Sequence, residues 1–275
     1  MKKERFITSI FNYCDYWCER CAFTQRCRNF SMGRELEREA DGKTAKDEKG
    51  RTDAVNREFW DKLADTVRES SFSSKAGDWV GDIDFDAKPS PEDLARMDRH
   101  DKAVSAHPLT RMAYAYMDKA HAWLKSADKD LQKVAQELLE SSKSKFAEDD
   151  FEEAAHEIGD MLEVVQWYHT LLPPKTARAV SGLLERNDPD SDFGDMVEDM
   201  RLDDANGSAK VVLAAIERST AAWLSLREIL PNREDDILEM LVLLSRMTRG
   251  LNTAFPGAKA FVRPGFDENV PGGGQ

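Results

Sequence analysis

The residues of this chain that could carry chemistry are concentrated near its N-terminus. All four cysteines of the 275-residue sequence lie there, at Cys14, Cys18, Cys21 and Cys27. Cysteines that served only as small buried side chains would be scattered along the sequence. The spacing C-x3-C-x2-C-x5-C instead allows four thiolates to meet at one point. It predicts a metal centre with these four residues as its ligands.

Two kinds of metal centre suit four clustered thiolates. A compact run of cysteines favours an iron–sulfur cluster of the 4Fe-4S type, because one loop can wrap around several iron atoms. A structural zinc site also takes four thiolates, in a tetrahedron, but zinc fingers and ribbons usually separate their ligand pairs by about twelve or more residues. We therefore expect an iron–sulfur cluster as the cofactor, with zinc as the alternative and metal-free or redox-active cysteines as the remaining reading.

The first three cysteines also invite comparison with a known family. Cys14, Cys18 and Cys21 reproduce the C-x3-C-x2-C spacing and so resemble radical S-adenosylmethionine enzymes. That family usually has an aromatic residue before its third cysteine, where this chain has Arg20, and it is built on a β/α barrel. Cys27 would also fill the iron position that the family leaves open. We therefore do not assign the chain to it.

Residues between and beside the cysteines favour a folded site. Aromatic side chains that could shield a cluster and pack the segment are Phe11, Tyr13, Tyr16, Trp17, Phe23 and Phe30. Three arginines could balance the thiolate charge, namely Arg20, Arg26 and Arg28.

A second group of candidate ligands lies on predicted helices. Asp118-x-x-His121 and Glu153-x-x-His156 each place a carboxylate and an imidazole one helical turn apart. Glu217 and Glu239 lie within strongly apolar sequence, which predicts that both carboxylates are buried and need partners. With Asp118, His121, Glu153 and His156, they resemble the ligand inventory of ferritin-like di-iron proteins, although the chain order differs. The resemblance implies a di-iron oxidase or oxygenase as an alternative function.

Simpler roles compete for the same residues. Glu153, His156, Asp160 and Glu163 fall on one polar stripe of a helix, which is typical of a solvated face. Arg218 and Arg246 are available as ion-pair partners for Glu217 and Glu239. His169 falls on an apolar helix face, which favours a core histidine bonded to a carbonyl or carboxylate group.

Hydrophobic periodicity predicts helices almost throughout and only one weak strand signal, so the expected fold is an all-α, multi-helix bundle with an irregular N-terminal cysteine-rich metal-binding segment. The expected helices are 53–70, from Ser90-Pro91 to His107, 108–124, 128–146, 150–172, a short one ending at Arg186, 208–230 and 233–251. Pro173-Pro174 is expected to stop a helix, and 187–206 reads as an acidic loop. The predicted organisation is a cysteine-rich segment (1–40), a linker (41–53), the bundle (54–254) and a flexible tail (255–275).

Composition limits the partners. A net charge of −13 makes nucleic acid an unfavourable partner, and we expect a protein partner instead, one with a basic surface. No apolar run approaches the roughly 20 residues that span a bilayer, so we expect no membrane association and a cytoplasmic location. A zinc-stapled interaction scaffold is a further alternative function. Common catalytic motifs are missing from the sequence, which leaves open whether the chain is an enzyme and how it oligomerises.

Overall fold

The computed structural model describes residues 6–42, 88–141, 148–186 and 195–267. These ranges contain seven α-helices and no β-strand, which confirms the all-α prediction. The chain forms two compact units, described separately below: residues 1–11 with 18–95, and residues 12–17 with 96–275. The helix predicted at 53–70 and the linker from residue 43 onwards lie outside the described residues.

The first unit contains most of the cysteine-rich segment. Short 3-10 turns at Cys18–Arg20 (η2) and Thr24–Arg26 (η3) lead into α1, Arg28–Gly42. An earlier 3-10 turn, η1 (Ile10–Tyr13), is divided between the two units. The segment was expected to be irregular up to residue 40, whereas its last third is this regular helix. Ile10 and Leu36 are buried, and α1 contacts η3.

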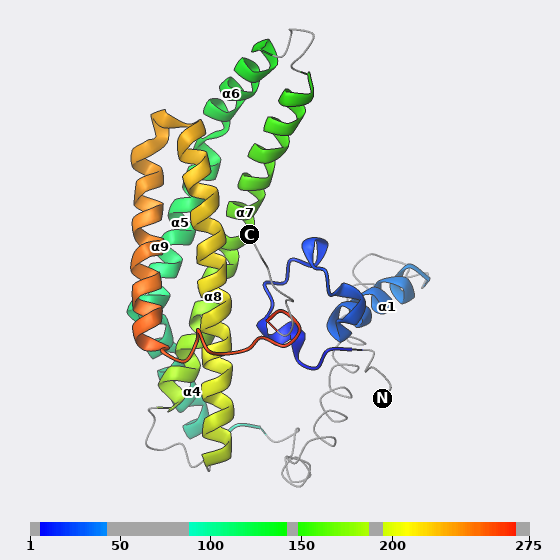
Figure 1. Ribbon diagram of the computed structural model, residues 1–275. Coiled ribbons are helices and arrows are strands. Elements are labelled where there is room, and N and C mark those ends of the chain that lie inside the picture. Colours follow the sequence, from blue (N-terminus) through cyan, green and yellow to red (C-terminus); the bar gives the residue numbers. More distant parts are fainter. Residues whose placement is uncertain (1–5, 43–87, 142–147, 187–194, 268–275) are drawn as a thin grey trace. The chain divides into compact units, whose positions relative to one another are not determined.

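The remaining described helices are α4 (Pro91–Ala106), α5 (Pro108–Ser126), α6 (Asp128–Ser141), α7 (Glu148–Arg186), α8 (Asp195–Ile229) and α9 (Glu234–Ala254), with the 3-10 turn η4 (Pro231–Arg233) before α9. Figure 1 shows α5, α7, α8 and α9 running side by side. Because α5 and α8 each contact both α7 and α9, these four helices close into a four-helix bundle.

The spacing of apolar residues explains this packing. On α9 the buried residues are Ile237, Met240, Leu244, Met247 and Leu251, which alternate steps of three and four. This spacing places one apolar stripe along one side of a helix, toward the neighbouring helices. Large aromatic side chains complete the core. The rings of Trp123 and Trp223 pack edge to face, with their centroids 4.8 Å apart.

Two predicted helix starts are confirmed by their caps. Ser90 Oγ accepts a hydrogen bond from the Asp93 N–H at 3.1 Å, before α4 begins at Pro91. Likewise, His107 Nδ1 accepts from the Leu109 N–H at 3.2 Å at the start of α5. In both cases a proline occupies the first turn, where its missing N–H is harmless.

Three boundaries differ from the sequence prediction. Pro173 and Pro174 lie inside α7 instead of ending it. The expected acidic loop at 187–206 is helical from Asp195, so α8 starts earlier than predicted. After α9, Phe255 and Ala258 are buried, so the first part of the expected flexible tail contributes to the core, while residues 268–275 lie outside the described ranges. In the described ranges, every helix is too short or too polar to span a bilayer.

Candidate functional site

A short 3-10 turn joins two of the four cysteines, Cys18 and Cys21. The Cys21 N–H donates to the Cys18 carbonyl at 3.2 Å, which closes the turn at η2. The Phe23 N–H points at Cys21 Sγ, with a nitrogen–sulfur distance of 3.4 Å. An amide directed at sulfur stabilises the thiolate form and tunes a metal bound to it. Cys27 follows the next turn, where its N–H donates to the Thr24 carbonyl.

A backbone hydrogen bond closes the chain around these turns. The Ile7 N–H donates to the Arg26 carbonyl at 3.0 Å, so the backbone between the two residues forms a loop. We call residues 7–27 the cysteine loop. Tyr16, between Cys14 and Cys18, has a φ of 57°, a left-handed conformation that is uncommon for a bulky residue. Such strain persists only where surrounding contacts hold it.

In the second unit, Asp15 fixes residues 12–17 to the bundle. Its carboxylate accepts hydrogen bonds from Tyr168 Oη and from an Arg218 nitrogen, each at 2.8 Å. Its carbonyl accepts from Trp167 Nε1 at 2.9 Å. The ring of Trp17 also stacks on Trp167, with centroids 5.2 Å apart. Burial, the largest cause, raises the pKa of Tyr168 to about 12, so this phenol is a neutral hydrogen-bond donor at pH 7.

Lys175 of α7 is a buried cation beneath the same segment. The residue is only 6% exposed, and its ammonium donates to the Asn12 carbonyl at 3.3 Å. It also lies over the Tyr16 ring, 4.5 Å from the centroid. Burial lowers the pKa of Lys175, and the charge of Cys14 opposes that shift. The positive charge therefore lies in the electrostatic reach of one predicted metal ligand.

The structure describes all four cysteines, each of them partly exposed and none in a disulfide. It brings Cys18 and Cys21 into one turn. Across the described residues, however, no three His, Cys, Asp or Glu side chains form a group that could hold a metal ion. The four-cysteine centre therefore stays a prediction from the sequence spacing.

The six helical carboxylates and histidines are all exposed: Asp118, His121, Glu153, His156, Glu217 and Glu239. The prediction that Glu217 and Glu239 are buried was wrong, because both fall outside the three-and-four spacing that faces the core of α8 and α9. The expected ion pairs of these glutamates with Arg218 and Arg246 were also wrong, because Glu239 and Arg218 have other partners. Glu239 binds Lys119 at 2.6 Å, and Arg218 binds Asp15.

His169 behaves as the simpler reading predicted. It is buried on α7, and its Nδ1 lies 3.1 Å from the Val165 carbonyl oxygen. Its ring stacks on that of His121, with centroids 5.9 Å apart. Burial, the largest cause, lowers the pKa of His169, which favours the neutral imidazole of a structural core residue.

Sequence reasoning missed the residues that hold residues 12–17 to the bundle within the second unit. Asp15, Tyr168, Lys175 and Arg218 belong to no recognised motif, and they meet only through tertiary packing. The sequence contains one signal for them. Tyr168 and Lys175 are seven positions apart, which places both on the same face of a helix.

Comparison of the chain with protein-family models, with curated proteins and with solved structures finds no match. The functional argument therefore depends on the residues themselves.

Proposed function

We propose that this chain is a metal-binding protein whose cysteine loop holds an iron–sulfur cluster, with Cys14, Cys18, Cys21 and Cys27 as ligands. The observation that carries the proposal is the Cys18–Cys21 turn, in which the Phe23 amide is directed at the Cys21 sulfur. Backbone amides directed at sulfur are a recurring means of stabilising and tuning thiolate-bound clusters. Cys14 and Cys27 are assigned as ligands because of their spacing in the sequence.

The charge beneath the segment supports the same proposal. A metal ion can bind only the thiolate form of cysteine, and a nearby cation favours that form. Lys175 supplies such a cation beside Cys14, from a position where water does not screen it well. A cluster with four thiolate ligands carries net negative charge, which a buried ammonium complements.

The ligand count also limits the role of the centre. When sulfur atoms of the protein fill all four ligand positions, no position remains open for a substrate. The proposed role is therefore electron transfer, redox sensing or structural stabilisation, and not substrate chemistry at the metal. The six exposed helical carboxylates and histidines take no part in it.

Metal analysis of the full-length chain, purified without oxygen, tests the proposal. We expect brown protein with broad visible absorption that contains iron and acid-labile sulfide in equal amounts. A variant with all four cysteines changed to serine should contain neither, while its circular dichroism remains helical. Because the chain has only four cysteines, this variant lacks every thiol.

Each contrary outcome has a clear meaning. Colourless protein with one zinc per chain would replace the iron–sulfur cluster by a structural zinc site. Protein without stoichiometric metal, even after reconstitution with iron and sulfide, would contradict the whole proposal. Iron that survives in the four-serine variant would instead point to the carboxylates and histidines of the helices.

A further inference from the structure

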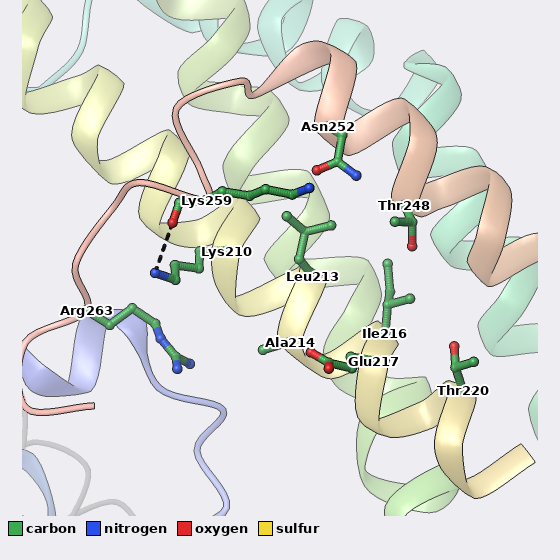
Figure 2. Close-up of a pocket in the computed structure, with 10 residues that line it drawn as sticks. All are labelled: Lys210, Leu213, Ala214, Ile216, Glu217, Thr220, Thr248, Asn252, Lys259 and Arg263. Carbon is green, nitrogen blue, oxygen red and sulfur yellow. Dashed lines mark hydrogen bonds between the residues drawn. The ribbon is translucent and has the colours of Figure 1, made fainter. Parts of the chain in front are cut away.

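A groove with opposite charges at its two ends runs along α8 in the second unit. The cavity has a volume of about 540 Å³ and is bounded by α8, α9 and the chain that follows α9 (Figure 2). Its floor is apolar and consists of Leu213, Ala214 and Ile216. Small-molecule sites in proteins have volumes of about 300–1,000 Å³ and combine an apolar lining with a few polar groups that orient the ligand. This groove has both properties.

One end of the groove is positively charged. It is lined by three cations, Lys210, Lys259 and Arg263. The Asp267 carboxylate forms ion pairs with two of them, Lys210 and Arg263. Lys210 and Arg263 each contact Asp267 at 2.9 Å. Partial burial raises the pKa of Asp267, but its bonds to Arg263 and Lys210 lower it far below the usual range, so this carboxylate is ionised at neutral pH. Three cations against one carboxylate leave this end positive.

The third cation is available to a ligand. Lys259 has no ion pair among the described residues, and its side chain extends across the groove toward Asn252 of α9 (Figure 2). Its ammonium is therefore placed to bind a carboxylate or phosphate that enters from solvent. The Asn252 amide lies next to it and can donate a further hydrogen bond.

The other end of the groove is negative. Glu217 and Thr220 on α8 face the groove, with Thr248 on α9 across from them (Figure 2). Glu217 has no hydrogen bond or ion pair within the described ranges. Its carboxylate can therefore accept hydrogen bonds from a ligand ammonium, as can the Thr220 hydroxyl oxygen.

The two ends are separated by a defined length. Lys210 and Glu217 are seven positions apart on one helix, which corresponds to about 10 Å at 1.5 Å per residue. An extended three-residue peptide also spans about 10 Å. A ligand with two anionic groups would be repelled by Glu217, and a ligand with two cationic groups would be repelled by the lysine end. The charge pattern therefore selects a molecule with one charge of each sign.

We propose that this groove binds a small zwitterionic molecule about 10 Å long, of the short-peptide class. Its carboxylate binds the positive end, where Lys210 and Lys259 line the groove, its ammonium binds Glu217, and its apolar middle lies on Leu213 and Ile216. The proposal is independent of the metal centre, because no cysteine lines the groove.

Titration of the full-length chain with trialanine, followed by NMR chemical shifts, tests the proposal. We expect saturable shifts confined to amides of α8, α9 and residues 255–263. Trialanine that is acetylated at its amine and amidated at its carboxylate should bind at least about tenfold more weakly, since capping removes the charged hydrogen bond at each end.

Two variants assign the ends of the ligand. Glu217→Gln should remove the penalty for acetylating the amine but keep the penalty for amidating the carboxylate, and Lys259→Gln should do the reverse. Both side chains are exposed, so the fold should persist. Glu228→Gln and Lys125→Gln, which are exposed but do not line the groove, serve as matched controls and should bind trialanine like the parent chain.

Three results would overturn the proposal. Trialanine could fail to saturate at millimolar concentration, or the doubly capped peptide could bind as tightly as trialanine. Inorganic phosphate could also match the affinity of trialanine, which would make the groove a simple anion site.

Discussion

Lys175 is a buried charge next to residues that flank one of the predicted metal ligands. An ammonium group has three donors, and burying it without strong acceptors is costly. The Lys175 ammonium donates to one carbonyl at 3.3 Å and lies over one aromatic ring. Both belong to residues that flank Cys14 closely, Asn12 and Tyr16. A negatively charged metal–thiolate centre at Cys14 would explain why this position carries a lysine.

We therefore predict that Lys175→Met weakens metal binding by the cysteine loop about tenfold, because outer-shell groups typically contribute 10–100-fold to metal affinity. Methionine keeps the length and apolar stem of lysine but removes its charge. Competition with a chelator, with zinc as the probe metal, measures the effect. Lys175→Arg should retain most of the affinity, and Lys125→Met, which changes an exposed lysine on α5, should retain all of it. Equal zinc affinity in Lys175→Met and the parent chain would contradict this role.

The prolines of α7 show packing overriding a local signal. A proline in a helix interior costs about 3 kcal/mol, which is why the sequence predicted an end at Pro173. Burial of Leu172 before the prolines and of Ala179 and Val180 after them keeps both halves of the helix on the same core. Each large apolar side chain buried in this way contributes about 1.5–3 kcal/mol. This burial opposes the cost of the two prolines, and one helix runs through them.

Gly207 is a second case in which an element depends on a tertiary neighbour. It lies inside α8, where glycine costs about 1 kcal/mol relative to alanine. A Cβ atom at this position would lie 2.8 Å from Phe261 Cζ and would also overlap the Tyr13 ring. The absence of a side chain lets both rings pack directly on the helix, 4.8 Å apart from centroid to centroid.

We predict that Gly207→Ala lowers the free energy of unfolding by about 1–3 kcal/mol, as is typical of overpacking, despite its better helix propensity. The matched control is Gly159→Ala in α7, where an added Cβ meets nothing within 4 Å. That variant should gain about 0.5–1 kcal/mol from helix propensity. Urea unfolding of both variants measures the difference. Stabilisation of both proteins to the same extent would show that Gly207 is not a close-packing position.

At the scale of the whole molecule, three tyrosines with raised pKa values link stability to alkaline pH. Burial is the largest cause that raises the pKa values of Tyr13, Tyr116 and Tyr168, each from 10.0 to about 12. The folded state thus holds the phenol protons more tightly than the unfolded state. Their contribution is complete below pH 10 and is lost as the pH rises from about 10 to about 12.

We therefore predict that the free energy of unfolding falls between about pH 9 and about pH 11.5, with Tyr116 contributing on the order of 2 kcal/mol of the loss. Urea unfolding at the two pH values measures it. Tyr116→Phe should reduce the pH-dependent loss, although it also removes the acceptor of the Trp223 Nε1–H bond and costs about 1 kcal/mol at neutral pH. Tyr114→Phe, on the exposed face of the same helix, should leave the pH dependence unchanged. If Tyr116→Phe lost as much stability as the parent chain, Tyr116 would not be the titrating group.

The sequence alone determined the features that depend on neighbours along the chain. The apolar spacing specified an all-α bundle, because each helix must bury one stripe of side chains. The caps at Ser90 and His107 specified two helix starts, because their hydrogen bonds span only two or three residues. The clustering of the cysteines was also visible, since it is a property of spacing alone.

Features that depend on contacts between distant segments became visible in the folded structure alone. It showed Glu217 and Glu239 to be exposed, joined Asp15 to Tyr168 and Arg218, buried Lys175 beneath residues 12–17, and assembled the groove of α8 and α9. The physical reason is that burial and charge pairing are set by which helix faces meet, and helices of similar composition can meet in several ways. Local sequence fixes the stripe on each helix, whereas the packing of all the helices together selects which side chains become neighbours.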